Sequence, residues 1–128
     1  MSRRALMGVV AAVGLLGTAG GLAFGGVKQI MPLYVNAASR YANAGLSETY
    51  NTADSTQYAE CGTNGSAGYC SFRDASGSYY SCSTTDPALI AVIRSMSPES
   101  FISVAWDASA NCTYVLSYAS SRSAVKVP

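Results

Sequence analysis

Four cysteines are the residues of this chain whose type and spacing most directly indicate chemistry. Cys61, Cys70, Cys82 and Cys112 all follow a long apolar segment near the N-terminus. An even number of cysteines in a small domain outside the cytoplasm is typical of a disulfide framework. Three pairings are possible, and we favour Cys61–Cys70 with Cys82–Cys112. A zinc site is disfavoured because the sequence contains no CxxC pair and no histidine.

The complete absence of histidine restricts the reactions open to this protein. It excludes a Ser-His-Asp triad, removes the commonest general acid–base group near neutral pH, and removes the usual axial ligand of haem. The other groups that could act on a substrate are isolated in the sequence: Asp86, Glu99, Asp107, Arg94 and Arg122. Asp86 fits a helix cap and Asp107 fits a turn. We therefore predict no catalytic residue, no metal ion and no cofactor.

The cysteines and the isolated charged residues all follow an uncharged segment of 23 residues, 5–27. Its sequence is ALMGVVAAVGLLGTAGGLAFGGV. A helix of this length reaches ~35 Å, which is enough to cross a hydrocarbon core of ~30 Å. The alternative is a cleaved signal peptide, but the apolar region of such peptides usually spans only ~7–15 residues. We therefore predict a retained transmembrane helix.

Flanking charges predict the orientation of this helix. Arg3 and Arg4 lie in a short tail, residues 1–4, and arginines favour the cytoplasmic side. The rest of the chain is then periplasmic or extracellular, attached to the inner (cytoplasmic) membrane. Tyr34 follows the helix at the position expected for an aromatic anchor at the outer membrane interface.

Glycines recur at a regular interval inside the apolar segment. Gly17, Gly21 and Gly25 are four residues apart, and Gly14 falls close to the same helical face. Small residues at this spacing allow another helix to approach closely. We expect these glycines to pack against transmembrane helices of other subunits or of the protein's own copies, although glycine is also generally frequent in membrane helices.

Two further regions follow the anchor. Residues 28–60 are predicted as a helical extension or linker, since Leu33, Ala37, Tyr41 and Ala44 form a stripe at helical spacing. A loose linker from Ala44 onward is the alternative. Residues 61–128 are predicted as a disulfide-stapled extracytoplasmic α+β domain. The formal net charge is +1 with no basic block, so nucleic acid is not expected as a partner.

Local patterns inside residues 61–128 predict a short helix and an antiparallel sheet. A hairpin is expected from 69–73 and 78–82, joined by the turn residues DASG. Asp86 and Pro87 are a helix start signal for residues 88–96, although the β-branched residues there would also fit a strand. Residues 102–106 and 112–118 alternate with period two, and the second segment has Cys112, Tyr114, Leu116 and Tyr118 on one side. This pattern predicts strands with one buried face, which Trp106 and the tyrosines would fill. A third short strand is expected at 123–127.

A long apolar helix that becomes amphipathic, followed by a loop and a small disulfide-bonded sheet, resembles a type IV pilin or pseudopilin. The segment ISVAWDASANCTYVLSYAS also resembles the final hairpin of small pilins. The resemblance implies a subunit whose apolar helix packs among its copies in the core of a filament. The prepilin cleavage motif is absent, because Gly8 is followed by Val9 and the fifth residue after the glycine is Val13 instead of glutamate.

The fold class predicted is therefore α+β, with a single N-terminal transmembrane helix leading into a small extracytoplasmic domain. We expect a non-catalytic accessory subunit of a larger bacterial membrane complex, for example a respiratory or photosynthetic one. Its partners would be the lipid bilayer and neighbouring transmembrane helices. A pilin-like filament subunit is the alternative, and a surface adhesin or a small enzyme is less favoured.

Overall fold

The computed structural model describes residues 30–121, which form a small α+β domain with two antiparallel sheets. Its elements in chain order are β1 (Tyr34–Asn36), β2 (Tyr41–Gly45), α1 (Leu46–Tyr50), β3 (Tyr58–Thr63), β4 (Gly68–Arg73), β5 (Tyr79–Thr84), α2 (Pro87–Arg94), β6 (Phe101–Trp106) and β7 (Cys112–Tyr118). The predicted transmembrane helix at 5–27 with its four glycines, the predicted orienting residues Arg3 and Arg4, and the predicted strand at 123–127 all lie outside the described residues. Within residues 30–121, the helices are too short to span a bilayer.

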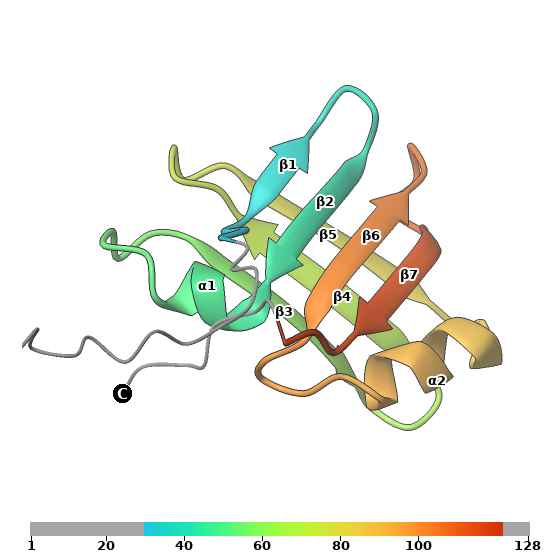
Figure 1. Ribbon diagram of the computed structural model, residues 1–128. Helices are drawn as coiled ribbons and strands as arrows, with labels where there is room; N and C mark the ends of the chain where they lie inside the picture. The colour runs from blue at the N-terminus through green and yellow to red at the C-terminus, as the bar shows by residue number, and fades with distance from the viewer. Residues whose placement is uncertain (1–29, 122–128) are drawn as a thin grey trace, which may run out of the picture.

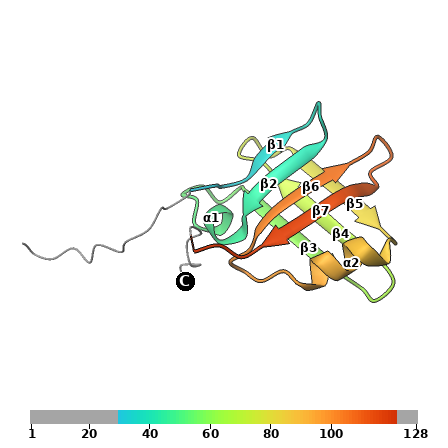
Figure 2. The same cartoon turned by 45° about the vertical axis from the view of Figure 1, so that its right-hand side comes forward.

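The two sheets face each other as layers. One has four strands in the order β1-β2-β6-β7, and the other has three in the order β3-β4-β5. The strands of the two sheets cross one another when viewed through the layers (Figures 1 and 2). Crossed sheets of this kind bury the inward-facing side chains of both layers between them. α2 lies across one end of the layers, where it contacts β7, β3 and β4.

The core lies between the sheets and is built from alternate residues of the strands. The four-stranded sheet contributes small and β-branched residues, and the three-stranded sheet contributes Phe72 and the half-cystines: Ala42, Ala44, Ile102, Val104 and Val115 face Cys70, Phe72 and Cys82. Trp106 joins the layers, because its ring centroid lies 6.1 Å from those of both Phe72 and Tyr80. Close packing around one aromatic cluster therefore fixes the two sheets against each other.

The local predictions for residues 69–106 are confirmed. β4 and β5 form the expected hairpin, with Gly77 at φ +88° in its turn, where a side chain would be strained. α2 begins as expected: the Asp86 side chain accepts a hydrogen bond of 2.8 Å from the Ala88 backbone N–H, and Pro87 occupies the first turn. Ile90 and Ile93 of this helix are buried, so it is a helix and not the alternative strand.

The helical extension predicted at 28–60 is wrong. β1 and β2 form a hairpin there, and the only helix in the described part of that stretch is the five-residue α1. Arg40 has φ 53°, a conformation that interrupts a helix, and Asn36 accepts a hydrogen bond from the Ser39 N–H to close the turn. The alanines of β2 have high helix propensity, but pairing with β6 buries them completely and overrides that preference. The domain therefore begins before residue 61.

The predicted buried face of β7 is wrong for the residues that follow Cys112. A bulge opposite Trp106 pairs Trp106 with Cys112 but Ala105 with Tyr114, so Thr113 is an extra residue. Because the side-chain period of a strand is two, one inserted residue moves every later side chain to the other face. Cys112, which precedes the bulge, is buried as predicted. After the bulge Val115 is buried, whereas Tyr114 and Leu116 are 48% and 37% exposed.

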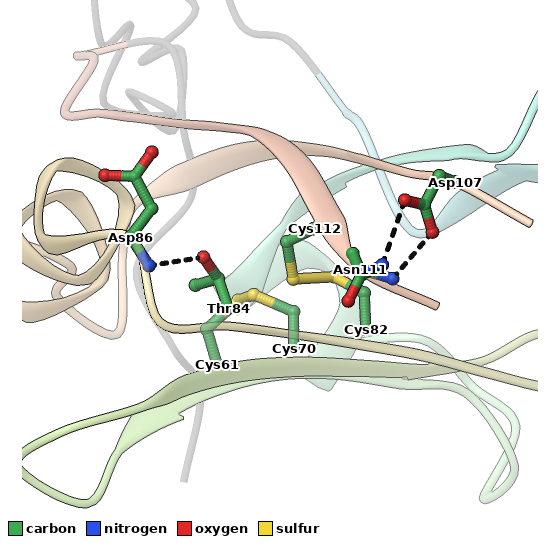
Figure 3. Close-up of a disulfide and its surroundings, with 8 residues drawn as sticks. All are labelled: Cys61, Cys70, Cys82, Thr84, Asp86, Asp107, Asn111 and Cys112. Atoms are coloured by element: carbon green, nitrogen blue, oxygen red, sulfur yellow. Dashed lines mark hydrogen bonds between the residues drawn. A yellow bond between two sulfur atoms is a disulfide. The ribbon is translucent and has the colours of Figure 1, made fainter. Parts of the chain in front are cut away.

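Both favoured disulfides are present. Cys61–Cys70 joins neighbouring positions on β3 and β4, and Cys82–Cys112 joins the three-stranded sheet to the four-stranded one. Cys70 and Cys82 are partners across β4 and β5, so the two bonds lie next to each other in the core (Figure 3). At this one place, Cys61–Cys70 links β3 to β4, and Cys82–Cys112 links the two sheets.

A candidate docking face

The outer surface of the four-stranded sheet is unusual in its lack of charge. β1, β2, β6 and β7 together contain no lysine, arginine, aspartate or glutamate. At the end of β2, Glu48 is buried beside Gly45. Charged residues are found in the loops at the ends of the strands, at Arg40, Glu99 and Asp107. The two helices lie beyond the ends of these strands, so neither crosses the face in Figure 1. We call the outward side of these strands the outer face.

Strand register places the outer-face residues in rows. One row is Asn36, Tyr41, Ala105 and Tyr114, the next is Tyr34, Asn43, Ser103 and Leu116, and the last is Phe101 with Tyr118. The buried neighbours Ala42, Ile102 and Val104 point the other way, into the core. Small side chains therefore occupy β6, one of the two central strands, at Ser103 and Ala105, and Tyr41 and Tyr114 lie on either side of Ala105.

Aromatic rings on the outer face pair with one another. The ring centroids of Tyr34 and Tyr41 are 6.0 Å apart, and those of Phe101 and Tyr118 are 4.9 Å apart. Tyr34 and Tyr114 nevertheless remain about half exposed. Exposed aromatic side chains on strands that carry no charged residue resemble the composition of the buried centre of protein–protein interfaces.

The outer side of the three-stranded sheet differs in chemistry. It carries Glu60, whose carboxylate accepts a 2.8 Å hydrogen bond from the Ser71 hydroxyl. It also carries Arg73, whose guanidinium lies 5.8 Å from the centre of the Tyr58 ring. The absence of charge is thus a property of one layer and not of the described surface as a whole.

Comparisons with protein-family models, with curated proteins and with solved structures find no match. The function is therefore inferred from the chemistry of the domain.

The groups considered for catalysis are dispersed, and several have structural roles. Asp86 caps α2, and Asp107 accepts hydrogen bonds of 2.9 Å from the backbone N–H groups of Ser109 and Asn111. The bonds between Asn111 and Asp107 are drawn in Figure 3. Arg94 donates to the Gly65 carbonyl at 3.0 Å, and Glu99 is an exposed loop residue. Arg122 lies outside the described residues. Residues 30–121 bring together no set of three acidic or cysteine side chains that could hold a metal ion.

An open cavity of about 340 Å³ lies near the far end of the sandwich, between α1, β3 and the loop that follows α2. Its lining is mainly apolar, with Glu60 as the acid: Leu46, Tyr50, Ala59, Glu60, Cys61, Met96, Ser97 and Pro98. Since that carboxylate is already hydrogen-bonded to Ser71, the cavity has few polar groups directed at a ligand. The outer face is therefore the stronger candidate for recognition.

The sequence alone did not identify this face. Tyr114 and Leu116 were predicted to be buried, because no pattern in the sequence reveals the bulge at Thr113. Tyr34 was predicted as a membrane-interface anchor, and the structure places it on β1 in contact with Tyr41. The one signal in the sequence was that residues 101–106 and 112–118 contain no charged residue. Because the large side chains of these segments were predicted to be buried, the lack of charge did not indicate an exposed face.

Proposed function

We propose that this protein is a non-catalytic, single-span accessory subunit of a larger bacterial membrane complex. Residues 5–27 would anchor it with the N-terminus in the cytoplasm. The described domain, outside the cytoplasm, would dock through its outer face. The observation that carries the proposal is that this face combines exposed aromatic side chains with strands that contain no charged residue.

The described aspartates support a structural role as well. Asp54, Asp74 and Asp107 each accept backbone N–H hydrogen bonds within their own loops, and Asp86 caps a helix. A carboxylate occupied in this way stabilises a turn, and it is less able to act as an acid or base on a substrate. Two disulfides add rigidity to a domain that presents one chemically distinct surface.

Gradient sedimentation of native membranes tests this proposal. A mild-detergent extract would be separated on a density gradient, and the fraction that contains the chain would be identified by mass spectrometry. We expect the chain at fixed stoichiometry with other membrane subunits. Ala105→Arg, which places a charge in the outer face, should release it from them, whereas Ser83→Arg, on the outer side of β5, should not.

Two outcomes would contradict the proposal. If both arginine variants sediment with the same partners, the outer face does not dock. If the chain is instead found with copies of itself alone in sheared filaments, and is shortened at its N-terminus, the alternative of a pilin-like filament subunit is supported.

A further inference from the structure

The four half-cystines differ in how far solvent can reach them. Cys70, Cys82 and Cys112 are buried in the core, at 0%, 3% and 6% exposure. Cys61 is only half-buried, and it lines the open cavity between α1, β3 and the loop that follows α2. A disulfide reacts with an external thiol only where a thiolate can reach one of its sulfurs. Of the two bonds, Cys61–Cys70 is therefore the one with a route to solvent.

The cavity opens at the edge of the three-stranded sheet, where β3 is the outermost strand. Ala59 and Cys61 of β3 are the partners of Phe72 and Cys70 on β4, which are completely buried. Because cross-strand partners share a face, Ala59 and Cys61 lie on the inner side of β3. Both residues line the cavity, whose volume of about 340 Å³ is enough to admit a small molecule. The inner side of β3 is thus reached from outside without separation of the two sheets.

Strand register determines which sulfur of the bond can be attacked. Cys61, Cys70 and Cys82 form one row across β3, β4 and β5. In thiol–disulfide exchange the attacking sulfur approaches nearly in line with the S–S bond, from the side opposite the leaving sulfur. For Cys61 this line leads away from β4, toward the free edge of the sheet. For Cys70 it leads toward β5, where the Cys82–Cys112 disulfide occupies the core (Figure 3).

We infer that Cys61–Cys70 is a thiol–disulfide exchange site for a small dithiol reductant that enters through the cavity. The first thiolate attacks Cys61 Sγ and forms a mixed disulfide, while the bond to Cys70 breaks and Cys70 Sγ leaves with the electron pair and takes up a proton. The second thiol of the reductant then displaces the Cys61 thiolate, which is protonated in turn. The reductant is oxidised to a disulfide, and Cys61 and Cys70 are reduced to thiols.

Opening of this bond leaves the domain folded. Cys61–Cys70 joins β3 to β4, and these strands are also hydrogen-bonded along the whole of β3. Cys82–Cys112, which joins the two sheets, stays closed because both of its half-cystines are buried. The exchange site does not depend on the outer face, since none of the cavity residues belongs to that face.

Reduction of the folded full chain tests the site. The chain, purified in mild detergent, is treated with dithiothreitol without denaturant, quenched with acid at intervals, and labelled with N-ethylmaleimide in urea. Peptide mass spectrometry then gives the reduced fraction at each cysteine. We expect Cys61 and Cys70 to be reduced about tenfold faster than Cys82 and Cys112, or more. In a sample unfolded by urea beforehand this difference should disappear, since burial no longer protects either bond.

A monothiol identifies the sulfur that is attacked. 2-Mercaptoethanol lacks the second thiol that completes the reduction, so it should leave a mixed disulfide on the protein. After acid quenching, mass spectrometry should find this adduct on Cys61 and not on Cys70.

Variants of the cavity test the route of entry. Ala59→Phe fills the space beside Cys61 and should slow reduction of Cys61–Cys70 by dithiothreitol about tenfold, because access limits exchange. Ala59→Ser, the matched control, keeps the cavity open and should leave the rate unchanged. Circular dichroism checks that the variants fold. Ser97→Phe, at the exposed rim of the cavity, should also slow the reaction, and it decides the question if Ala59→Phe does not fold.

Three results would overturn the inference. Equal rates for the two disulfides in the folded chain, or faster reduction of Cys82–Cys112, would show that the cavity gives no selective access. An adduct on Cys70 would show that the attack does not occur at Cys61. An unchanged rate in a folded phenylalanine variant would show that the reductant does not enter through the cavity.

Discussion

Single aspartates hold the loops of this domain in place. Asp107 accepts hydrogen bonds from the backbone N–H groups of Ser109 and Asn111 and from the Asn111 side chain, within the turn between β6 and β7. Asp54 and Asp74 act in the same way in the loops before β3 and before β5. A loop held by its own carboxylate keeps its adjoining strands in register.

The hydrogen bonds in these loops lower the pKa of each carboxyl. The main cause is the Asn111 N–H for Asp107, the Gln57 N–H for Asp54 and the Ser76 hydroxyl for Asp74, each of which favours the charged form. The folded-state pKa therefore lies below the ordinary value of 3.8. Such a group stabilises the fold fully above its unfolded-state pKa, and the contribution is lost as the pH falls through the folded-state pKa.

Asp107→Asn tests this effect at one residue. We expect a lower urea midpoint than that of the unmodified protein at pH 7. The difference should shrink as the pH falls below 3.8, because the Asp107 carboxyl is protonated first in the unfolded state and, at lower pH, in the folded state as well. Equilibrium urea unfolding at a series of pH values measures it. Glu99→Gln, at an exposed acid, is the control. An equal difference at pH 7 and at pH 3 would contradict the role given to the carboxylate.

At the scale of elements, the two disulfides have unequal roles. Cys82–Cys112 closes a separation of 30 residues and joins the two sheets, while Cys61–Cys70 closes a separation of 9 residues within one sheet. Loop-closure entropy in the unfolded chain gives about 3.6 kcal/mol for the longer bond and about 2.6 kcal/mol for the shorter one. The bond between the sheets should therefore stabilise the fold more.

Paired alanine variants compare the two bonds. Cys82→Ala with Cys112→Ala should lower the free energy of unfolding by about 1 kcal/mol more than Cys61→Ala with Cys70→Ala does. Urea denaturation of the three proteins gives the comparison, and alkylation before and after reduction confirms which thiols are free. A larger loss from the Cys61–Cys70 pair would contradict the assignment of Cys82–Cys112 as the main staple.

Elements with local signals could be predicted from the sequence, and elements defined by distant pairing could not. The Asp86–Pro87 helix start and the turn residues of the β4–β5 hairpin act within a few residues. By contrast, β2 is a strand because β6, some sixty residues later, pairs with it. The bulge at Thr113 likewise arises from the pairing of two strands and leaves no pattern in either one.

At the scale of the whole molecule, the outer face depends on the two features that could not be predicted, the β1–β2 hairpin and the bulge in β7. The β1–β2 hairpin adds Tyr34 and Tyr41 to the four-stranded sheet, and the bulge turns Tyr114 and Leu116 outward. The sequence showed that these strands lack charge, but not that one side of them is exposed. A domain whose four-stranded sheet has exposed aromatic side chains and no charged residue in its strands is the arrangement that the proposed docking requires.

Oxidative footprinting in the native membrane tests most directly whether the outer face is covered. Hydroxyl-radical labelling of Tyr114 would be compared between membranes and the purified chain dispersed as monomers, with Tyr79 as the internal control. We expect Tyr114 to be labelled several-fold less in the membrane and Tyr79 to be labelled equally in both samples, since only the outer face would be occupied. Equal labelling of Tyr114 in both samples would show that the face is open in the membrane, and that docking does not occur there.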